Sequence, residues 1–416
     1  MGKRKSIVSL ITIGDEILLG HTLDSNSNYI ASRLSEIGIT VRSIKVCADK
    51  REDIIGELNS AFSGGDIVIV TGGLGPTVDD ITRPVLSEYF ESKLIFREDL
   101  MKKIEDFYTE RNIPLIEQVR VQAFFPEGAE PIENKHGTAP GMFFRKHDKL
   151  CFSTPGVPRE MKGMMDDFII PMLLRENRGS GIRYRIIRTV GIGESYAAEK
   201  IGEWKFPEVH IAYLPNYGRV DLRISTEAED SKDADRLLKE AFEYISERLD
   251  EYIYGEDKQE FVQTIGELLK SKGWRLAVAE SCTGGLLGSM ITAVSGSSDY
   301  FSGGFIAYSN EVKIEQLGVP GEIIAQYGAV SEETAEEMAV CARTKIHADV
   351  GIGITGIAGP SGGTAEKPVG TTFIAVSTPV STKVHKYEFK YDRNMNRFRA
   401  AFTALNLLFT ELKTMR

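Results

Sequence analysis

Cysteine is scarce in this sequence, and long hydrophobic runs are missing. The four cysteines, Cys47, Cys151, Cys282 and Cys341, are scattered and form no C-x-x-C pair. Such spacing is typical of reduced thiols in a cytosolic protein, and it disfavours a disulfide framework or a zinc site. No apolar run approaches the length that spans a bilayer, so we expect a soluble, cytoplasmic protein without membrane contact.

Basic residues are also too few to outnumber the acidic ones. The chain has 50 Lys and Arg against 60 Asp and Glu, which gives a formal net charge of −10. Nucleic acids and anionic lipids favour an excess of positive charge, so we expect no direct nucleic-acid binding. A small anionic ligand stays compatible with this charge, because a few backbone N–H groups can hold a phosphate.

The 416 residues exceed what one ordinary core holds, which predicts two or three domains. The first third alternates apolar runs with helical patterns, as in the predicted strands 7–13 and 66–71. This alternation is typical of a parallel sheet covered on both faces. A similar pattern returns late in the chain. We therefore predict two three-layer α/β domains with mainly parallel sheets, residues 1–175 and 258–416, joined by a small α+β domain over 176–257.

A glycine-rich segment, Thr71-Gly-Gly-Leu-Gly-Pro76, follows the predicted strand 66–71, and Asp79 and Asp80 come soon after it. Glycine allows close backbone approach and positive φ, so this turn can form a nest for an anion. Phosphate beside two carboxylates would be repelled unless a divalent cation bridges them, which predicts a hard-cation site. The alternative is that the glycines only turn the chain and the two acids cap a helix.

Three other polar turns are expected on the same rim, because they follow or flank strands of the same predicted sheet. These are Gly14-Asp15-Glu16, the segment Asn134–Gly141, and Pro155-Gly-Val-Pro158. Four such turns together favour a ligand site over a set of plain chain reversals.

In the last third, Glu280-Ser-Cys-Thr-Gly-Gly285 places two hydroxyls and a thiol at a strand-to-helix turn. Ser281 would lie near the helix N-terminus, where free N–H groups can support an oxyanion. Histidine is rare here, so Lys313 is the better candidate base, provided that its amine is desolvated and neutral. Two alternatives stay open: Ser281 as a plain helix cap, and Cys282 as a rival nucleophile.

The N-terminal motifs resemble those of the N-terminal domain of CinA proteins, which shares its fold with molybdopterin-binding proteins. They are Gly14-Asp-Glu16, Asp24-x-Asn26, Thr71-Gly-Gly-Leu-Gly-Pro-Thr-x-Asp-Asp-x-Thr82, Asn134-x-x-Gly137-Thr-Ala-Pro-Gly141 and Pro155-Gly-x-Pro-x-Glu160. The resemblance covers about residues 5–175 and implies metal-dependent cleavage of ADP-ribose at its pyrophosphate. The departures at Leu74-Gly75 and Asp79-Asp80 disfavour molybdopterin chemistry.

On this reading the divalent cation, of unknown identity, is held by Asp15, Asp79 and Asp80. The residues expected to bind substrate in this domain are Gly72, Gly73, Leu74, Gly75, Thr77, Thr82, Gly137, Thr138, Pro155 and Gly156.

The C-terminal motifs resemble those of the CinA C-terminal domain, which is similar to nicotinamide mononucleotide deamidase. They are Glu280-Ser-x-Thr-Gly-Gly285, Gly304-x-x-x-Tyr-Ser-Asn-x-x-Lys313, Gly328-Ala-Val-Ser331, Thr355-Gly-Ile-Ala-Gly-Pro360 and Lys367-Pro-Val-Gly370. The resemblance spans about 258–414 and implies hydrolysis of a carboxamide without a metal or other cofactor. It implies Ser281 as nucleophile and Lys313 as base, with Tyr308 and Thr355 in support. The residues expected to bind nicotinamide mononucleotide are Thr283, Gly284, Gly285, Asn310, Gly356 and, at its phosphate, Arg393 and Arg397.

Residues 182–255 resemble the KH-like insert of the same family but contain no GxxG loop for gripping a nucleic-acid backbone. A spacer or dimerisation role is therefore expected, and the resemblance implies a homodimer. The whole chain is predicted to be a bifunctional enzyme acting on two metabolites of NAD. The alternative is a binding protein associated with competence or DNA damage, with one or both domains catalytically silent.

Overall fold

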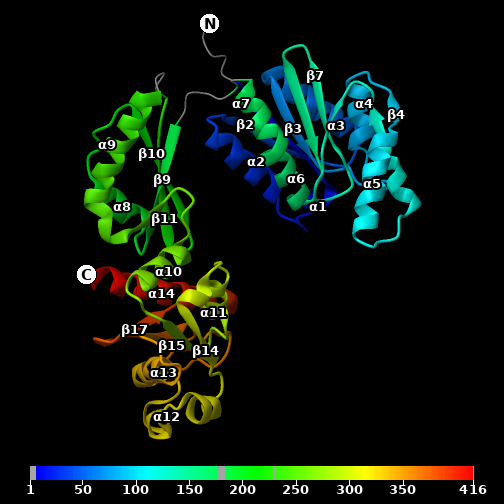
Figure 1. Cartoon of the computed structure of the whole chain (residues 1–416). Coiled ribbons are helices and arrows are strands. Elements are labelled where there is room, and N and C mark those ends of the chain that lie inside the picture. The colour runs from blue at the N-terminus through cyan, green and yellow to red at the C-terminus, as the bar shows by residue number, and fades with distance from the viewer. Residues whose placement is uncertain (1–5, 177, 179–182, 228–230, 416) are drawn as a thin grey trace. The chain divides into compact units, whose positions relative to one another are not determined.

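The structure is a computed structural model that describes residues 6–176, 178, 183–227 and 231–415 (Figure 1). The chain separates into two compact units, Met1–Tyr184 with Thr226–Arg236 and Arg185–Ser225 with Leu237–Arg416. Within the described residues, none of the helices has the length and apolar character that a membrane crossing requires.

The N-terminal sheet has six strands in the order β2-β1-β3-β8-β7-β6. Strands β2, β1, β3 and β8 are parallel neighbours, whereas β7 and β6 continue the sheet as antiparallel strands. The predicted α/β fold with a mainly parallel sheet is thus confirmed for this domain. The strands are β1 Val8–Ile13, β2 Val41–Cys47, β3 Ile67–Thr71, β6 Glu130–Ile132, β7 Gly141–Lys146 and β8 Lys149–Thr154.

Helices cover both faces of this sheet, because its central strands are apolar on both sides. In β3, Ile67 and Ile69 enter one hydrophobic cluster while Val68 and Val70 enter the other, as the two-residue period of a strand requires. A separate two-stranded antiparallel sheet is formed by β4 Leu94–Phe96 and β5 Phe124–Pro126. The helices are α1 Asp15–Leu18, α2 Ser25–Glu36, α3 Arg51–Gly64, α4 Thr82–Tyr89, α5 Glu98–Glu110, η1 Glu117–Ala123, α6 Pro158–Met164, η2 Met165–Ile169 and α7 Ile170–Arg175.

The middle of the chain forms a small four-stranded sheet in the order β10-β11-β9-β12, in which β9 and β12 are antiparallel. The long helix α9 is amphipathic, and its Leu238, Ala241 and Ile245 belong to the buried cluster of this domain. The elements are β9 Arg183–Val190, α8 Glu194–Ile201, β10 Val209–Asn216, β11 Arg219–Thr226, α9 Ser231–Leu249, η3 Asp250–Tyr252 and β12 Ile253–Glu256.

The C-terminal sheet has five strands in the order β14-β13-β15-β16-β17. Only β14, β13 and β15 are parallel, while β16 and β17 are antiparallel to their neighbours, so this sheet is more evenly mixed than predicted. The reason is that loops rather than helices join β15 to β16 and β16 to β17, and such links connect antiparallel strands. The strands are β13 Leu276–Glu280, β14 Phe301–Ile306, β15 Val350–Gly356, β16 Thr371–Ser377 and β17 Thr382–Glu388.

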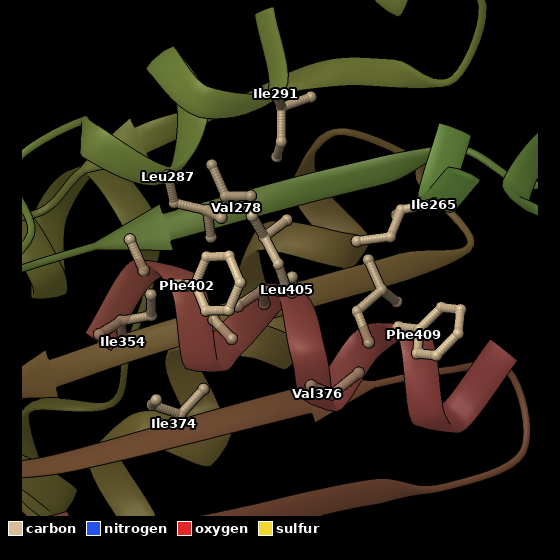
Figure 2. Packing of buried hydrophobic residues seen from close by; sticks show 14 of the residues in the cluster. Ile265, Val278, Leu287, Ile291, Ile354, Ile374, Val376, Phe402, Leu405 and Phe409 are labelled. Carbon is tan, nitrogen blue, oxygen red and sulfur yellow. The ribbon is translucent and has the colours of Figure 1, made fainter. Parts of the chain in front are cut away.

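One face of the C-terminal sheet is covered by the final helix α14, as Figure 2 shows. Phe402, Leu405 and Phe409 of this helix pack against strand residues such as Ile354 and Val376. On the other face, α13 packs with its alanines and Met338 against the sheet. The helices are α10 Phe261–Ser271, α11 Leu286–Thr292, η4 Ser297–Asp299, η5 Val312–Leu317, α12 Gly321–Tyr327, α13 Glu332–Lys345 and α14 Arg393–Thr414.

Candidate functional sites

Ser281 and Lys313 meet at the carboxyl end of the C-terminal sheet. Ser281 follows β13 directly, and Lys313 lies in the π-helical turn η5. The Lys313 Nζ lies 3.1 Å from the Ser281 Oγ, and it also donates to the carbonyl of Tyr308 at 3.2 Å. Ser281 is 8% exposed and Lys313 only 1%. The predicted nucleophile and base are therefore brought within hydrogen-bonding distance.

The Lys313 amine is shifted toward its neutral form. Burial lowers the pKa of Lys313 below the usual value of a lysine, and the negative charge of Glu311 only partly opposes this effect. A buried ammonium loses hydration that a nearby hydroxyl and carbonyl replace incompletely. The neutral amine has a free lone pair, so it can accept the proton of the Ser281 hydroxyl.

Cys282, the rival nucleophile, lies in the hydrophobic core of the C-terminal domain. Burial raises the pKa of Cys282 to about 12, so its sulfur is a thiol at neutral pH. Because the thiolate is the reactive form of cysteine, this environment disfavours Cys282 as a nucleophile.

Glu280, just before the nucleophile, is a site residue that the sequence analysis missed. Its carboxylate accepts the backbone N–H groups of Gly285, Leu287 and Gly288 at 2.8–3.0 Å. The expectation that N–H groups at the start of α11 are free to support an oxyanion is wrong for these three. An acidic residue that ends an apolar strand, just before S-x-T-G-G, was the available signal.

Of two arginines at the start of α14, Arg397 contacts the turn of residues 281–288, here called the nucleophile turn, and Arg393 contacts Tyr308. Arg397 Nη2 donates to the Thr283 carbonyl at 2.8 Å, and Arg393 Nη2 donates to the Tyr308 hydroxyl at 3.2 Å. Tyr308 itself is 61% exposed. Arg397 also lies close to Gly284, where a Cβ would be 3.6 Å from its Nη2. The two arginines therefore place positive charge next to the turn that carries Ser281.

The other predicted residues of this site have different surroundings. Thr355 is buried and its hydroxyl donates to the Ala329 carbonyl at 2.6 Å, so it does not contact Ser281 through that group. Gly356 pairs with Thr372 in the sheet. Asn310 is exposed in the segment before Lys313, and Gly285 starts α11 with positive φ. Thr283 is fully buried, and its hydroxyl has no hydrogen-bond partner.

In the N-terminal domain, two predicted turns meet at the end of β3. The Thr71 hydroxyl donates to the Pro155 carbonyl at 3.0 Å, and the Gly72 N–H donates to the Thr154 carbonyl at 3.0 Å. Asn26, whose role the sequence analysis did not assign, donates to both the Thr71 hydroxyl and the Gly156 carbonyl. The structure thus brings the glycine-rich turn and the Pro155-Gly156 turn together.

Some residues of the glycine-rich segment are turned inward. Thr82 is buried, and its hydroxyl and N–H donate to the carbonyls of Gly72 and Gly73 at 2.9 and 3.2 Å. Leu74 packs in the core, and its carbonyl accepts a bond from the buried Arg83. Burial lowers the pKa of Arg83 to about 10. Thr82 and the Leu74 side chain therefore shape the turn rather than face a ligand.

The acidic residues of this domain gather near the same edge. The Asp80 carboxylate accepts the Thr77 N–H at 2.9 Å and would contact a Cβ at Gly75. Burial raises the pKa of Asp49 above its usual value. The negative charges of Asp15 and Asp79 raise it further.

A divalent cation fits this edge only if a bound substrate supplies some of the coordinating atoms. Among the described residues, no three His, Cys, Asp or Glu side chains are grouped so that they could hold a metal ion. A Mg²⁺-like ion normally binds through one or two carboxylates plus substrate phosphates and water. Asp15, Asp79 and Asp80 offer carboxylates of this kind, so the cation stays a prediction that depends on bound phosphate.

Gly137 and Thr138 lie at a separate cavity, away from the glycine-rich turn. They line a cavity of about 410 Å³ between α5 and the segment 131–140. The carboxylate of Glu160 lies against Gly137 and accepts the Asn134 side-chain amide at 2.6 Å. Burial raises the pKa of Glu160. Gly137 therefore packs against Glu160 of α6, and Gly137 and Thr138 both line the cavity beside α5. This position is distinct from the Gly72 turn.

Comparison with known proteins covers nearly the whole chain. Residues 9–175 match the probable molybdopterin binding domain, 184–255 the damage-inducible protein CinA KH domain, and 258–412 the CinA C-terminal domain. The chain is 41% identical over 409 residues to a putative competence-damage inducible protein of Halothermothrix orenii, covering 98% of this chain and 99% of that one. The chain belongs to the CinA family.

A second relative that matches nearly the whole chain agrees with this assignment. A CinA-like protein of Cytophaga hutchinsonii is 38% identical over 410 residues, covering 98% of each chain. Among solved structures, the competence damage-inducible protein A of Klebsiella pneumoniae is 31% identical, matching 38% of this chain and 97% of its own with a TM-score of 0.37. The domains of this CinA protein indicate an enzyme of a hydrolase-like kind.

Proposed function

We propose that the C-terminal domain of this CinA protein hydrolyses the carboxamide of nicotinamide mononucleotide to a carboxylate and ammonia. The observation that carries the proposal is the 3.1 Å contact between the Ser281 Oγ and a Lys313 Nζ that is only 1% exposed. A serine next to a desolvated lysine is an arrangement that activates a nucleophile without histidine or metal.

The reaction proceeds through an acyl-enzyme. Neutral Lys313 accepts the proton of the Ser281 hydroxyl while the Oγ attacks the carboxamide carbon. As the tetrahedral intermediate collapses, the C–N bond breaks, and the Lys313 ammonium donates its proton to the departing nitrogen, which leaves as ammonia. Lys313, neutral again, then takes a proton from a water molecule whose oxygen attacks the ester carbon. As the ester C–O bond breaks, the Lys313 ammonium returns this proton to the Ser281 Oγ, and the acid product leaves and ionises to the carboxylate.

Positive charge next to the nucleophile turn supports a phosphorylated substrate. Arg393 and Arg397 extend from the first two turns of α14, and both donate to groups beside the Ser281–Lys313 pair. A guanidinium binds a phosphate through charge-assisted, often bidentate hydrogen bonds. We assign the two arginines to the substrate phosphate.

Replacing Ser281 by alanine is expected to lower ammonia release from nicotinamide mononucleotide by about 10³-fold or more, because the covalent nucleophile is lost. The Cys282→Ala variant is the matched control and is expected to keep activity near that of the wild type. Ammonia and the nucleotide product are measured together on the full chain. Release that survives the Ser281 substitution, or that is lost with Cys282 alone, contradicts the assignment.

We also propose that the N-terminal domain hydrolyses the pyrophosphate of ADP-ribose with a divalent cation. The convergence of the Gly72 and Pro155-Gly156 turns, with carboxylates at the same edge, supports this. When bound, the cation would neutralise phosphate charge and activate a water molecule. Backbone N–H groups of the glycine-rich turn would orient the phosphates, and Asp79 and Asp80 would hold the cation. Two copies of the whole chain are proposed to work as a homodimer.

Converting Asp79 and Asp80 to asparagine is expected to reduce Mg²⁺-dependent cleavage of ADP-ribose by more than about 10-fold, because the cation loses its anionic ligands. Ammonia release from nicotinamide mononucleotide serves as the internal control and should not change. The Ser281→Ala variant should lose ammonia release and keep cleavage of ADP-ribose. Unchanged pyrophosphate cleavage in the double variant would remove the two aspartates from the proposed site.

A further inference from the structure

The buried carboxylate of Glu280 closes the nucleophile turn into a rigid loop. Glu280 is 1% exposed, and its Oε2 accepts the N–H groups of Gly285 and Leu287, both at 3.0 Å. Its Oε1 accepts the Gly288 N–H at 2.8 Å. All three donors lie at the far end of the segment 281–288, and Glu280 directly precedes its first residue. The Glu280 side chain therefore ties the two ends of this segment together.

The backbone of Glu280 is held just as firmly. Its carbonyl accepts the Ala307 N–H at 2.8 Å, and the next N–H, that of Ser281, donates to Ile354 at 2.9 Å. Ala307 precedes Tyr308, whose carbonyl accepts the Lys313 ammonium. The same residue therefore contacts the nucleophile turn through its side chain and the lysine-bearing segment through its main chain.

A buried carboxylate needs strong hydrogen bonds, and three backbone N–H groups at the start of α11 supply them. The geometry has a catalytic consequence, because a nucleophile displaced by about 1 Å can lose 10²-fold in rate. We infer that Glu280 is a positioning residue, which holds the Ser281 hydroxyl at the Lys313 amine by clamping the turn from residue 281 to 288. The inference rests on the proposed serine nucleophile.

The Glu280→Gln variant tests the clamp with little change in volume. An amide has only one acceptor oxygen, so its NH₂ group faces either one or two of the backbone N–H groups, and one or two of the three bonds are lost. We expect covalent modification of Ser281 by phenylmethanesulfonyl fluoride to slow by about 10²-fold. We expect kcat for nicotinamide mononucleotide to fall in parallel, with KM changed less than threefold. The reagent is small and does not need the substrate-binding arginines.

The matched control is Glu411→Gln. Glu411 is also a buried glutamate of this domain, 8% exposed, but it pairs with Lys383 near the other end of α14. This variant should lose stability without loss of Ser281 labelling. Labelling is followed by mass spectrometry and folding by circular dichroism, so that a general loss of structure is separated from a displaced nucleophile.

Each outcome decides a different point. Labelling of Glu280→Gln at the wild-type rate overturns the positioning role while leaving the serine nucleophile in place. A wild-type protein whose Ser281 is not labelled at all overturns both this inference and the proposed amidase. If Glu280→Gln does not fold, Glu280→Asp takes its place, since it keeps two oxygens but cannot reach all three donors. Wild-type labelling in a folded Glu280→Asp variant likewise overturns the inference.

Discussion

Replacement of Lys313 by methionine is expected to lower kcat for carboxamide hydrolysis by about 10³-fold, within the range that a positioned general base contributes. Methionine has nearly the same length and suits a buried position, so the fold should be kept. The Lys345→Met variant is the control, because Lys345 is a lysine of the same domain whose amine donates to the Gln316 carbonyl and not to Ser281 or Tyr308. A Lys313→Met variant that retains more than a tenth of the wild-type kcat would contradict the role of base.

The rate of carboxamide hydrolysis is expected to depend on pH through the protonation of Lys313. The neutral amine is the active form, so the rate should rise with pH as Lys313 loses its proton. Because burial lowers the pKa of Lys313, the midpoint of this rise is expected below the value of about 10.4 for an ordinary lysine. Lys313→Arg stays charged at every accessible pH and should be inactive throughout. A wild-type profile without such a rise would argue against a lysine base.

Substitution of Gly72 by alanine is expected to abolish ADP-ribose cleavage and to destabilise the N-terminal domain. Gly72 has φ +111°, and a Cβ there would lie 2.1 Å from the carbonyl oxygen of Ile13. The left-handed backbone and this overlap together should cost about 3 kcal/mol or more. In a domain of this size that lowers the midpoint of thermal unfolding by roughly 6–12 °C.

Gly20→Ala is the matched control for this effect. Gly20 also has positive φ, +74°, but a Cβ there would have no atom within 4 Å. It should therefore show only the backbone cost of about 1 kcal/mol. Equal unfolding midpoints for the two variants would show that the close approach of Gly72 to Ile13 is not needed. Ammonia release should be unaffected in both.

The central strands of the N-terminal sheet were predictable where their apolar runs are continuous. The predicted strand at 7–13 is found as Val8–Ile13, and that at 66–71 as Ile67–Thr71. The mixed character of the C-terminal sheet was not predictable in the same way. Whether two neighbouring apolar strands run parallel depends on the link between them, and the link from β15 to β16 contains no helix.

The proximity of Ser281 and Lys313 was predictable because local motifs carry both residues. Contacts across long sequence separations were not. Asn26 joins Thr71 and Gly156, which lie 45 and 130 residues away. Thr82 and Leu74 belong to the glycine-rich motif, but the fold turns them inward. Membership of a motif indicates that a residue lies near the site. Whether its side chain points toward the site or into the core is decided by packing.

The contacts of α14 with the proposed amidase site have a consequence for how the protein is made. Ser281 and Lys313 leave the ribosome well before Arg393 and Arg397, and before the helix that covers one face of the domain core (Figure 2). A nascent chain that already contains nucleophile and base therefore still lacks both the core that holds them together and the charges that would retain substrate. If the proposed amidase depends on these groups, we expect it to become reactive only once the last helix has been synthesised.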